Sequence, residues 1–124
     1  MNTTTMSHTN LEYLKLMSDG DQEMEKVMLE MLLDELPSEF EKMKTLHAAQ
    51  EWKELSKVSH KMKSTLAFIG NADMTGANLK IEQLTKQESL PSADEVQVIG
   101  AMMEQFGEVL PEVMGELREV FEGY

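Results

Sequence analysis

The sequence predicts an all-α protein, built as an antiparallel four-helix bundle with a short extra N-terminal helix. From Leu11 onward, apolar residues recur at intervals of three and four, which is the period of amphipathic helices. No segment shows the alternation of apolar and polar residues that is typical of half-buried strands. The helical segments are joined by short connections, and such helices pack most simply as antiparallel neighbours.

The N-terminal part of the chain predicts a lead-in and a short helix. Residues 1–9 are polar and lack periodicity, so we expect a disordered lead-in in which His8 is a solvated tail residue. Residues 10–124 are then expected to form one helical-bundle domain. Within it, residues 11–17 form a short helix that stops at Ser18-Asp19-Gly20, a run that can also cap the next helix.

A long apolar stripe predicts the second helix. Pro37 lies within this stripe and is expected to kink or break the helix, because proline removes a backbone donor. Ser38 and Glu41 have the spacing of a capping box, so a restart of the helix at Ser38 is the alternative. The stripe consists of Met24, Val27, Met28, Met31, Leu32, Leu36, Phe40, Met43 and Leu46.

Three further helices follow with the same period. The third begins near Gln50 and stops at Gly70-Asn71, which is a C-terminal signal. After a fourth helix, Ser92 and Glu95 have capping-box spacing at the start of the last one, in which Pro111 is expected to introduce a kink. The apolar positions are Trp52, Leu55, Val58, Met62, Leu66 and Ile69, then Met74, Ala77, Ile81 and Leu84, then Val96, Ile99, Met103, Phe106, Leu110, Val113, Leu117 and Val120.

The composition limits the classes of partner and compartment. The 124 residues carry a formal net charge of −12, which argues against nucleic acid or anionic lipid as the main partner because both need a basic surface. The chain has no cysteine, so disulfides and thiolate metal sites are excluded. It shows no long apolar run and no signal-like leader, and we expect a cytoplasmic protein. The twelve methionines are interpreted as flexible core filling, with a methionine-lined ligand groove as the alternative.

His60 lies on a lysine-rich stretch of the third helix. With residues placed about 100° apart, the apolar positions of this helix fall on the side opposite His60, which therefore points to solvent. The surrounding lysines form a local basic patch on an acidic protein, and the alternative is an ordinary solvated polar face. These lysines are Lys53, Lys57, Lys61 and Lys63.

The residues around His60 suit the binding of a phosphoryl group. An exposed imidazole is largely neutral at pH 7, so a ring nitrogen offers its lone pair as a nucleophile or ligand. Lys63, one turn further along the helix, can reach an anion held on that nitrogen. Ser64 and Ala67 are small, so a partner protein can approach the ring closely.

Other chemistries fit the sequence less well. A metal site at His60 lacks a second histidine at i+4 and a carboxylate one turn away on the same helix, and the lysines repel a cation. His47, near the end of the second helix, is interpreted as an interfacial or capping residue. No recognisable catalytic triad, nucleophile elbow or glycine-rich phosphate loop is present. We therefore expect no cofactor and no metal held by this chain.

The stretch that contains His60 resembles the signature of histidine-containing phosphotransfer (HPt) domains, commonly H-x-x-K-G-S/A with a later glycine. Here it reads His60-Lys61-Met62-Lys63-Ser64-Thr65, with Gly70 in register. In the next helix, Met74, Asn78, Ile81 and Glu82 stand where members of this family often have an apolar residue, a small residue and a Leu-Glu pair. The upstream run also resembles the family, with a proline midway and a tryptophan before the histidine helix. The resemblance covers about residues 10 to 90.

Two positions depart from the pattern of this family. Ser64 replaces the usual glycine, which favours the helix but adds a side chain beside the ring and puts activity in doubt. Asn78 brings an amide to a position that is usually small and less polar, where it must find a hydrogen bond or stay near the surface.

The resemblance implies specific roles for residues near the histidine. His60 is expected to accept a phosphoryl group from the aspartyl phosphate of a receiver domain and to pass it to another receiver. Lys63 is expected to neutralise the phosphoryl oxygens, with Lys57 adding to the field. Glu82 is either the partner that orients the imidazole or a solvated helix glutamate, and Lys86 either helps with the phosphate or is a surface lysine.

The rest of the expected docking surface comprises Ser64, Ala67 and Phe68. Trp52 and Phe68 lie at the two rims of the exposed face, where each is either a core residue or a contact for the partner.

The predicted function is thus that of a phosphoryl carrier in a multistep two-component phosphorelay, without a kinase ATP-binding domain. The expected partners are response regulator receiver domains or a hybrid sensor histidine kinase, and the magnesium ion is expected on the receiver. We expect a monomer that binds neither nucleic acid nor membrane. A non-transferring adaptor with the same fold is the alternative function, and a metal-carrying bundle is the third.

Overall fold

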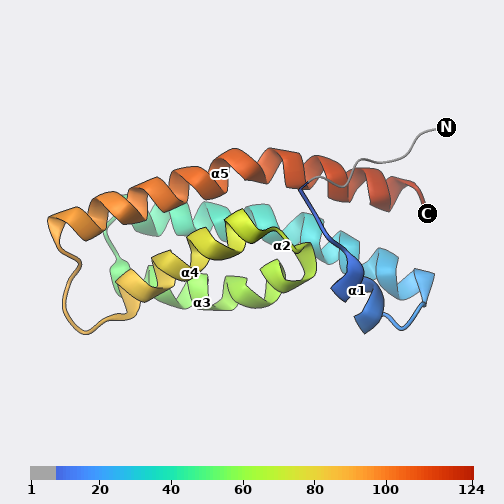
Figure 1. Ribbon diagram of the computed structural model, residues 1–124, viewed down its shortest axis with the longest axis horizontal. Coiled ribbons are helices and arrows are strands. Elements are labelled where there is room, and N and C mark those ends of the chain that lie inside the picture. Colours follow the sequence, from blue (N-terminus) through green and yellow to red (C-terminus); the bar gives the residue numbers. More distant parts are fainter. Residues whose placement is uncertain (1–7) are drawn as a thin grey trace.

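The computed structural model describes residues 8–124, which form five helices and no strand (Figure 1). The prediction of an all-α protein is confirmed. Helix boundaries agree closely with the apolar period of the sequence, and α2, α4 and α5 begin after residues whose side chains cap the helix. The helices are α1 (Glu12–Met17), α2 (Gln22–Ala48), α3 (Trp52–Ile69), α4 (Ala72–Lys86) and α5 (Ala93–Glu122).

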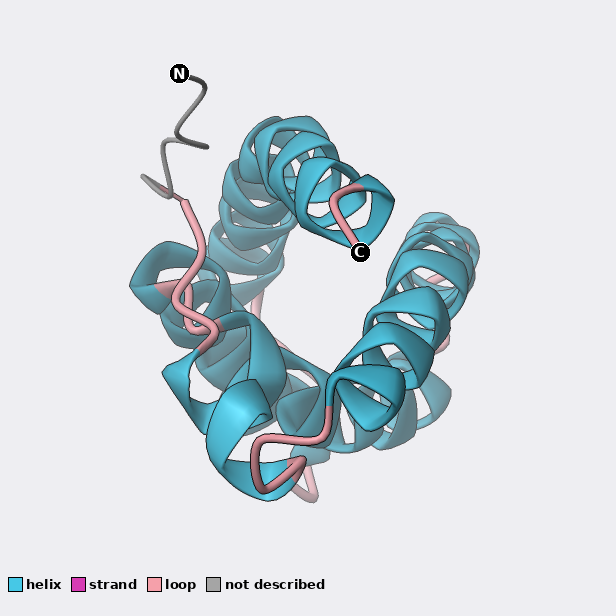
Figure 2. Cartoon of the chain, turned by 90° about the vertical axis from the view of Figure 1, so that its right-hand side faces the viewer, coloured by secondary structure: helices cyan, strands magenta, loops and turns pink. Residues whose placement is uncertain are grey.

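The four long helices pack in a ring, with α2 against α3, α3 against α4, α4 against α5 and α5 against α2. From α2 to α5, each helix runs in the opposite direction to the one before it, as Figure 1 shows. The end-on view in Figure 2 shows the helices surrounding a common centre. The short α1 lies outside this ring and contacts α2 and α3.

The core confirms most of the predicted apolar positions but corrects the first half of α2. Met24, Val27 and Met31 are about half exposed, whereas Leu29, which lies outside the predicted stripe, is fully buried. Two apolar stripes overlap in this segment, and the one that continues into Phe40 and Met43 faces α3 and α5. The core contains Leu11, Leu14, Leu29, Leu32, Leu36, Phe40, Met43, Trp52, Leu55, Met62, Leu66, Ile69, Met74, Ala77, Ile81, Ile99, Met103, Phe106, Val113 and Leu117.

Helix α2 runs without interruption through Pro37, so the alternative of a break and restart at Ser38 is wrong. The N-cap of α2 is Asp21, which directly follows the Ser18-Asp19-Gly20 run, and its carboxylate accepts hydrogen bonds from the backbone N–H groups of Glu23 and Met24. Burial of the flanking Leu36 and Phe40 offsets the lost backbone hydrogen bond of the proline. The capping box that Ser92 and Glu95 predicted at the start of α5 is confirmed.

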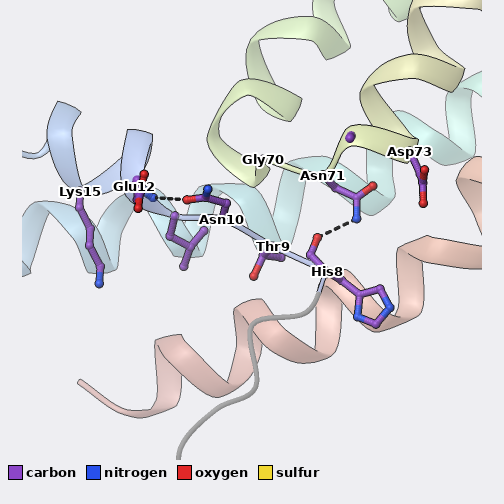
Figure 3. A pocket seen from close by; sticks show the side chains of 10 residues that line it. His8, Thr9, Asn10, Glu12, Lys15, Gly70, Asn71 and Asp73 are labelled. Atoms are coloured by element: carbon purple, nitrogen blue, oxygen red, sulfur yellow. Dashed lines mark hydrogen bonds between the residues drawn. The ribbon is translucent and has the colours of Figure 1, made fainter.

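The turn between α3 and α4 is built around Gly70. Its φ of 69° lies in the left-handed region, and a Cβ atom at this position would come within 2.5 Å of the carbonyl oxygen of Asn10. The backbone N–H of Asn10 donates to the carbonyl of Ile69 at 2.8 Å, and the side-chain amide of Asn71 donates to the carbonyl of His8 at 2.7 Å (Figure 3). Residues 8–10 therefore form a strap across this turn.

The strap also binds helix α5, which corrects the expectation for His8. The backbone N–H of His8 lies 3.1 and 3.0 Å from the two carboxylate oxygens of Glu116, and its ring Nδ1 lies 2.7 Å from Oε2. The hydroxyl of Thr9 donates to Oε1 at 2.8 Å. His8 is thus held by the protein rather than being a solvated tail residue, whereas residues 1–7 of the expected lead-in lie outside the described residues.

We expect the contacts of Glu116 to contribute to stability in a pH-dependent way. Burial alone would raise the pKa of this carboxyl, but the hydrogen bonds from His8 and Thr9 outweigh it and hold the pKa below 4.5. Glu116→Gln should lower the free energy of unfolding near pH 7 by about 1–3 kcal/mol. In the native chain this contribution should be present above pH 4.5 and disappear as the pH falls through the lowered pKa.

Denaturant unfolding of Glu116→Gln and of the native chain at neutral and acidic pH measures this contribution. Glu112→Gln is the matched control, because Glu112 lies one turn earlier on the same helix and is exposed. Equal losses of stability in the two variants would contradict a special role for Glu116.

Candidate functional site

His60 lies in the middle of α3 on its exposed face. The side chain is 71% exposed, which confirms the prediction that it points to solvent. Its orientation follows from the buried stripe of the helix, because these positions pack against α2 and α4 and leave the histidine on the outside. The buried stripe consists of Trp52, Leu55, Ser59, Met62, Leu66 and Ile69.

Glu82 of α4 contacts the imidazole ring of His60. The glutamate is 4% exposed, and its Oε2 lies 2.6 Å from Nδ1 of His60. An ionised carboxylate only accepts hydrogen bonds, so this contact needs the proton on Nδ1. In the neutral ring the lone pair is then on Nε2, the nitrogen that does not face Glu82.

Lys63 lies beside the other oxygen of the same carboxylate. Its Nζ is 2.9 Å from Oε1 of Glu82, which makes an ion pair, although Oε1 receives no well-oriented hydrogen bond among the described residues. Burial would raise the pKa of Glu82, but the contacts with Lys63 and His60 outweigh it and lower the pKa below 4.5. Glu82 is therefore a charged, buried carboxylate that binds both residues.

The other lysines of α3 do not form a free basic patch, in contrast to the interpretation of the sequence. Lys57 pairs with Glu54 at 3.1 Å, and Lys61 lies 3.4 Å from the carboxylate of Glu39. Lys53 donates to the backbone carbonyls at the end of α4. Each of these three lysines thus has an acidic or carbonyl partner, whereas Lys63 shares the carboxylate of Glu82 with His60.

Beyond His60, the outer side of α3 carries two small side chains and an aromatic one. Ser64 and Ala67 are exposed, and Phe68 is half-buried with its ring centroid 5.2 Å from that of Tyr13. A pocket opens beside Ser64 between α2 and α3. It is lined by Met28, Met31, Leu32, Glu35, Ser64, Thr65 and Phe68.

The remaining candidates are Trp52, His47, Lys86 and Lys57. Trp52 is a core residue, 8% exposed, and the ring of His47 lies against it at 6.1 Å between centroids. This contact fits the interfacial interpretation of His47. Lys86 is exposed at the last position of α4, one turn beyond Glu82, and Lys57 is held in its pair with Glu54.

Asn78 finds the hydrogen bonds that its burial requires, and its partner is a residue that sequence reasoning missed. Ser59, which directly precedes His60, is also fully buried and contacts the Asn78 amide. The available signal was the position of Ser59 between the buried Leu55 and Met62, since a serine on a buried stripe needs a partner.

Three further features of the described chain bear on its candidate functions. Among residues 8–124, no three histidine, cysteine, aspartate or glutamate side chains gather in a group that could hold a metal ion. None of the helices described is long and apolar enough to cross a membrane. The pocket beside the strap contains none of the candidate residues and is lined by His8, Thr9, Asn10, Leu11, Glu12, Lys15, Gly70, Asn71, Ala72 and Asp73 (Figure 3).

The fold and site together define a helical bundle that presents a histidine on an outer face, with its ring bound to a buried carboxylate. In a comparison with protein families, the model of the Hpt domain matches residues 27–119, and the chain belongs to this family. Comparisons with curated proteins and with solved structures give no match. Family membership implies a phosphotransfer role in phosphorelays and interaction with response regulator or kinase domains.

Proposed function

We propose that His60 accepts a phosphoryl group from the aspartyl phosphate of a receiver domain and passes it to another receiver. The observation that carries this proposal is the contact between Nδ1 of His60 and the buried Glu82, which leaves the lone pair on the outer ring nitrogen. Its most direct test is incubation of the chain with a phosphorylated receiver. Phosphate that is labile in acid and stable in base should then appear on the chain.

The transfer step is a displacement at phosphorus. The lone pair of Nε2 forms the new P–N bond while the P–O bond to the receiver aspartate breaks, and the aspartate leaves as a carboxylate. The proton on Nδ1 stays in its hydrogen bond to Glu82, whose negative charge stabilises the positive ring that forms. The reverse displacement passes the phosphoryl group to the next receiver, and the receiver is the expected holder of the magnesium ion.

Lys63 and Glu82 have different roles beside the imidazole ring of His60. Glu82 is rigidly placed by burial in α4, so it suits the task of orienting the imidazole and selecting its tautomer. Lys63 is 47% exposed on a flexible stem, so its ammonium can turn from Glu82 toward phosphoryl oxygens on Nε2. Lys57 and Lys86 are proposed to add weaker, longer-range positive charge, which for Lys57 is partly offset by its pair with Glu54.

The apolar face next to the histidine suits docking of the receiver. Ser64 and Ala67 leave room beside the ring, and the pocket formed by Met28, Met31 and Phe68 offers contact area for apolar side chains. A cytoplasmic location, a monomeric state and the absence of nucleic-acid and membrane binding stay predictions.

The adaptor that binds receivers without transfer is the second candidate, and the side chain of Ser64 favours it. In the transfer assay, an adaptor would form a complex with the receiver while the chain remains free of phosphate. That outcome would contradict the phosphotransfer proposal.

Lys63→Ala should slow phosphoryl transfer by about tenfold and leave the fold unchanged. This is less than the roughly hundredfold effect of a buried oxyanion donor, because Lys63 is half exposed. Initial rates of phosphoryl loss from a labelled receiver measure the effect. Lys61→Ala is the matched control, since Lys61 is an exposed neighbour paired with Glu39, and equal rates in both variants would make Lys63 part of an ordinary solvated face.

Substitutions at Ser64 should change transfer in opposite directions. Ser64→Leu places bulk beside the nucleophile and should block transfer, whereas Ser64→Gly should speed it at a helix-propensity cost of roughly half a kcal/mol or more. The time course of phosphoryl loss at equal folded concentration tests both variants. If the leucine variant transfers as fast as the native chain, this face of α3 does not dock the receiver.

A further inference from the structure

Ser59 and Asn78 form a fully buried polar bridge between α3 and α4. The hydroxyl of Ser59 lies 2.7 Å from the side-chain oxygen of Asn78 and 3.0 Å from its backbone carbonyl. In the other direction, the side-chain amide of Asn78 donates to the carbonyl of Ser59 at 2.9 Å. Both residues are 0% exposed, so these contacts join the two helices inside the core.

The bridge lies directly beside the pair formed by His60 and Glu82. Ser59 precedes His60 on α3, and Asn78 lies one turn before Glu82 on α4. The two pairs therefore make neighbouring connections between the same two helices. Any sliding or rotation of α3 against α4 that breaks the contact between Ser59 and Asn78 also changes the distance between His60 and Glu82.

Hydrogen bonds add a directional constraint to the apolar packing of α3 against α4. Apolar contacts are not directional, whereas hydrogen bonds weaken steeply with distance and angle. The contact of 2.6 Å between Nδ1 of His60 and Oε2 of Glu82 is equally sensitive, since a displacement of about 1 Å removes it.

We propose that Ser59 and Asn78 are positioning residues that hold α3 and α4 in the register at which Glu82 binds Nδ1 of His60. Through this contact they select the tautomer with the lone pair on Nε2. The effect of Ser59 and Asn78 on phosphoryl transfer rests on the proposed function of His60. Their effect on which ring nitrogen of His60 carries the proton does not.

A purely structural role for the bridge makes a different prediction. In that case its loss lowers stability but leaves the histidine ring of the folded protein unchanged. Thr85 provides the matched control, because this α4 residue is 1% exposed and its hydroxyl donates to the carbonyl of Ile81 within its own helix. Thr85→Val removes a buried hydroxyl without removing a connection between helices.

The experiment uses full-length chains with Ser59→Ala, Asn78→Ala, both substitutions together, or Thr85→Val. Nitrogen-15 NMR of the His60 ring reports which nitrogen carries the proton, and transfer from a phosphorylated receiver is measured in parallel under conditions where each chain is folded. We expect the bridge variants to lose the preference for the proton on Nδ1 and to transfer about tenfold or more slowly. Thr85→Val should retain both properties of the native chain.

The outcomes separate the two proposals. Native ring signals in folded Ser59→Ala and Asn78→Ala would overturn the positioning role, whatever the transfer rates are. If the double variant does not fold, the His60 ring signals of Ser59→Ala alone still test the proposal. This substitution removes a single hydroxyl group and so disturbs the fold least. If the native chain accepts no phosphate, the proposed function fails while the NMR comparison still decides the role of the bridge.

Discussion

A His60→Gln variant is expected to accept no phosphoryl group from a phosphorylated receiver while keeping the fold of the native chain. The imidazole of His60 supplies the nucleophilic nitrogen. The amide nitrogen of glutamine cannot replace it, because the lone pair of an amide nitrogen is delocalised. The side chain is 71% exposed, so its replacement removes little buried contact. Labelled phosphate on the chain measures acceptance, and circular dichroism with thermal unfolding measures the fold.

The matched control for this prediction is His47→Gln. His47 lies near the end of α2 against Trp52, away from the pair of His60 and Glu82, so its variant should accept phosphate at the native rate. Phosphate of the same chemical lability on the His60→Gln variant would place the acceptor elsewhere in the chain.

Replacement of Glu82 is expected to give the second large effect. Glu82→Ala should slow transfer by about 10- to 100-fold, because the ring loses the carboxylate that holds Nδ1 and stabilises its positive form. Glu82→Gln should fall between alanine and the native residue, since the amide oxygen still accepts from Nδ1 but carries no charge. The comparison of the two variants separates orientation of the ring from electrostatic stabilisation.

The pH dependence of this site follows from the lowered pKa of Glu82. The carboxylate is charged above pH 4.5, so its contribution to the folded state is present there and is lost as the pH falls through the lowered pKa. Glu82→Gln should remove this acid-dependent part of the stability. Unfolding by denaturant at neutral and acidic pH measures the difference.

Glu39→Gln is the control for the Glu82 variants. Glu39 is 7% exposed and binds Lys61 and Lys42, so it resembles Glu82 in burial and in its lysine partner but lies away from the histidine ring. It should lose stability and keep the native transfer rate. A Glu82→Ala chain that transfers as fast as Glu39→Gln would show that the carboxylate is not needed at the ring.

The local features of this protein could be predicted from the sequence because they depend on residues a few positions apart. The period of the apolar residues predicted every helix, and the spacing of Ser92 and Glu95 predicted the capping box of α5. The same period placed His60 on an exposed face, and the H-x-x-K spacing brought Lys63 within one turn of it. These features follow from the geometry of a single helix.

Resemblance to the family pointed to Glu82, but geometry within one helix could not. His60 and Glu82 are 22 positions apart, and their contact at 2.6 Å depends on the register of α3 against α4. Burial of the carboxylate also decides its state, because the competing effects of burial and of Lys63 and His60 on its pKa arise only when the helices pack.

The tertiary structure alone decided the features that depend on partners distant in the sequence. His8 binds Glu116, which is 108 positions away, and the apolar stripe of α2 that becomes buried is the one that matches α3 and α5. Helix α2 continues through Pro37 because packing on both sides offsets the missing hydrogen bond. Periodicity identifies the face of a helix that is able to be buried, but only the shape and charge of the neighbouring helices determine which side chains meet there.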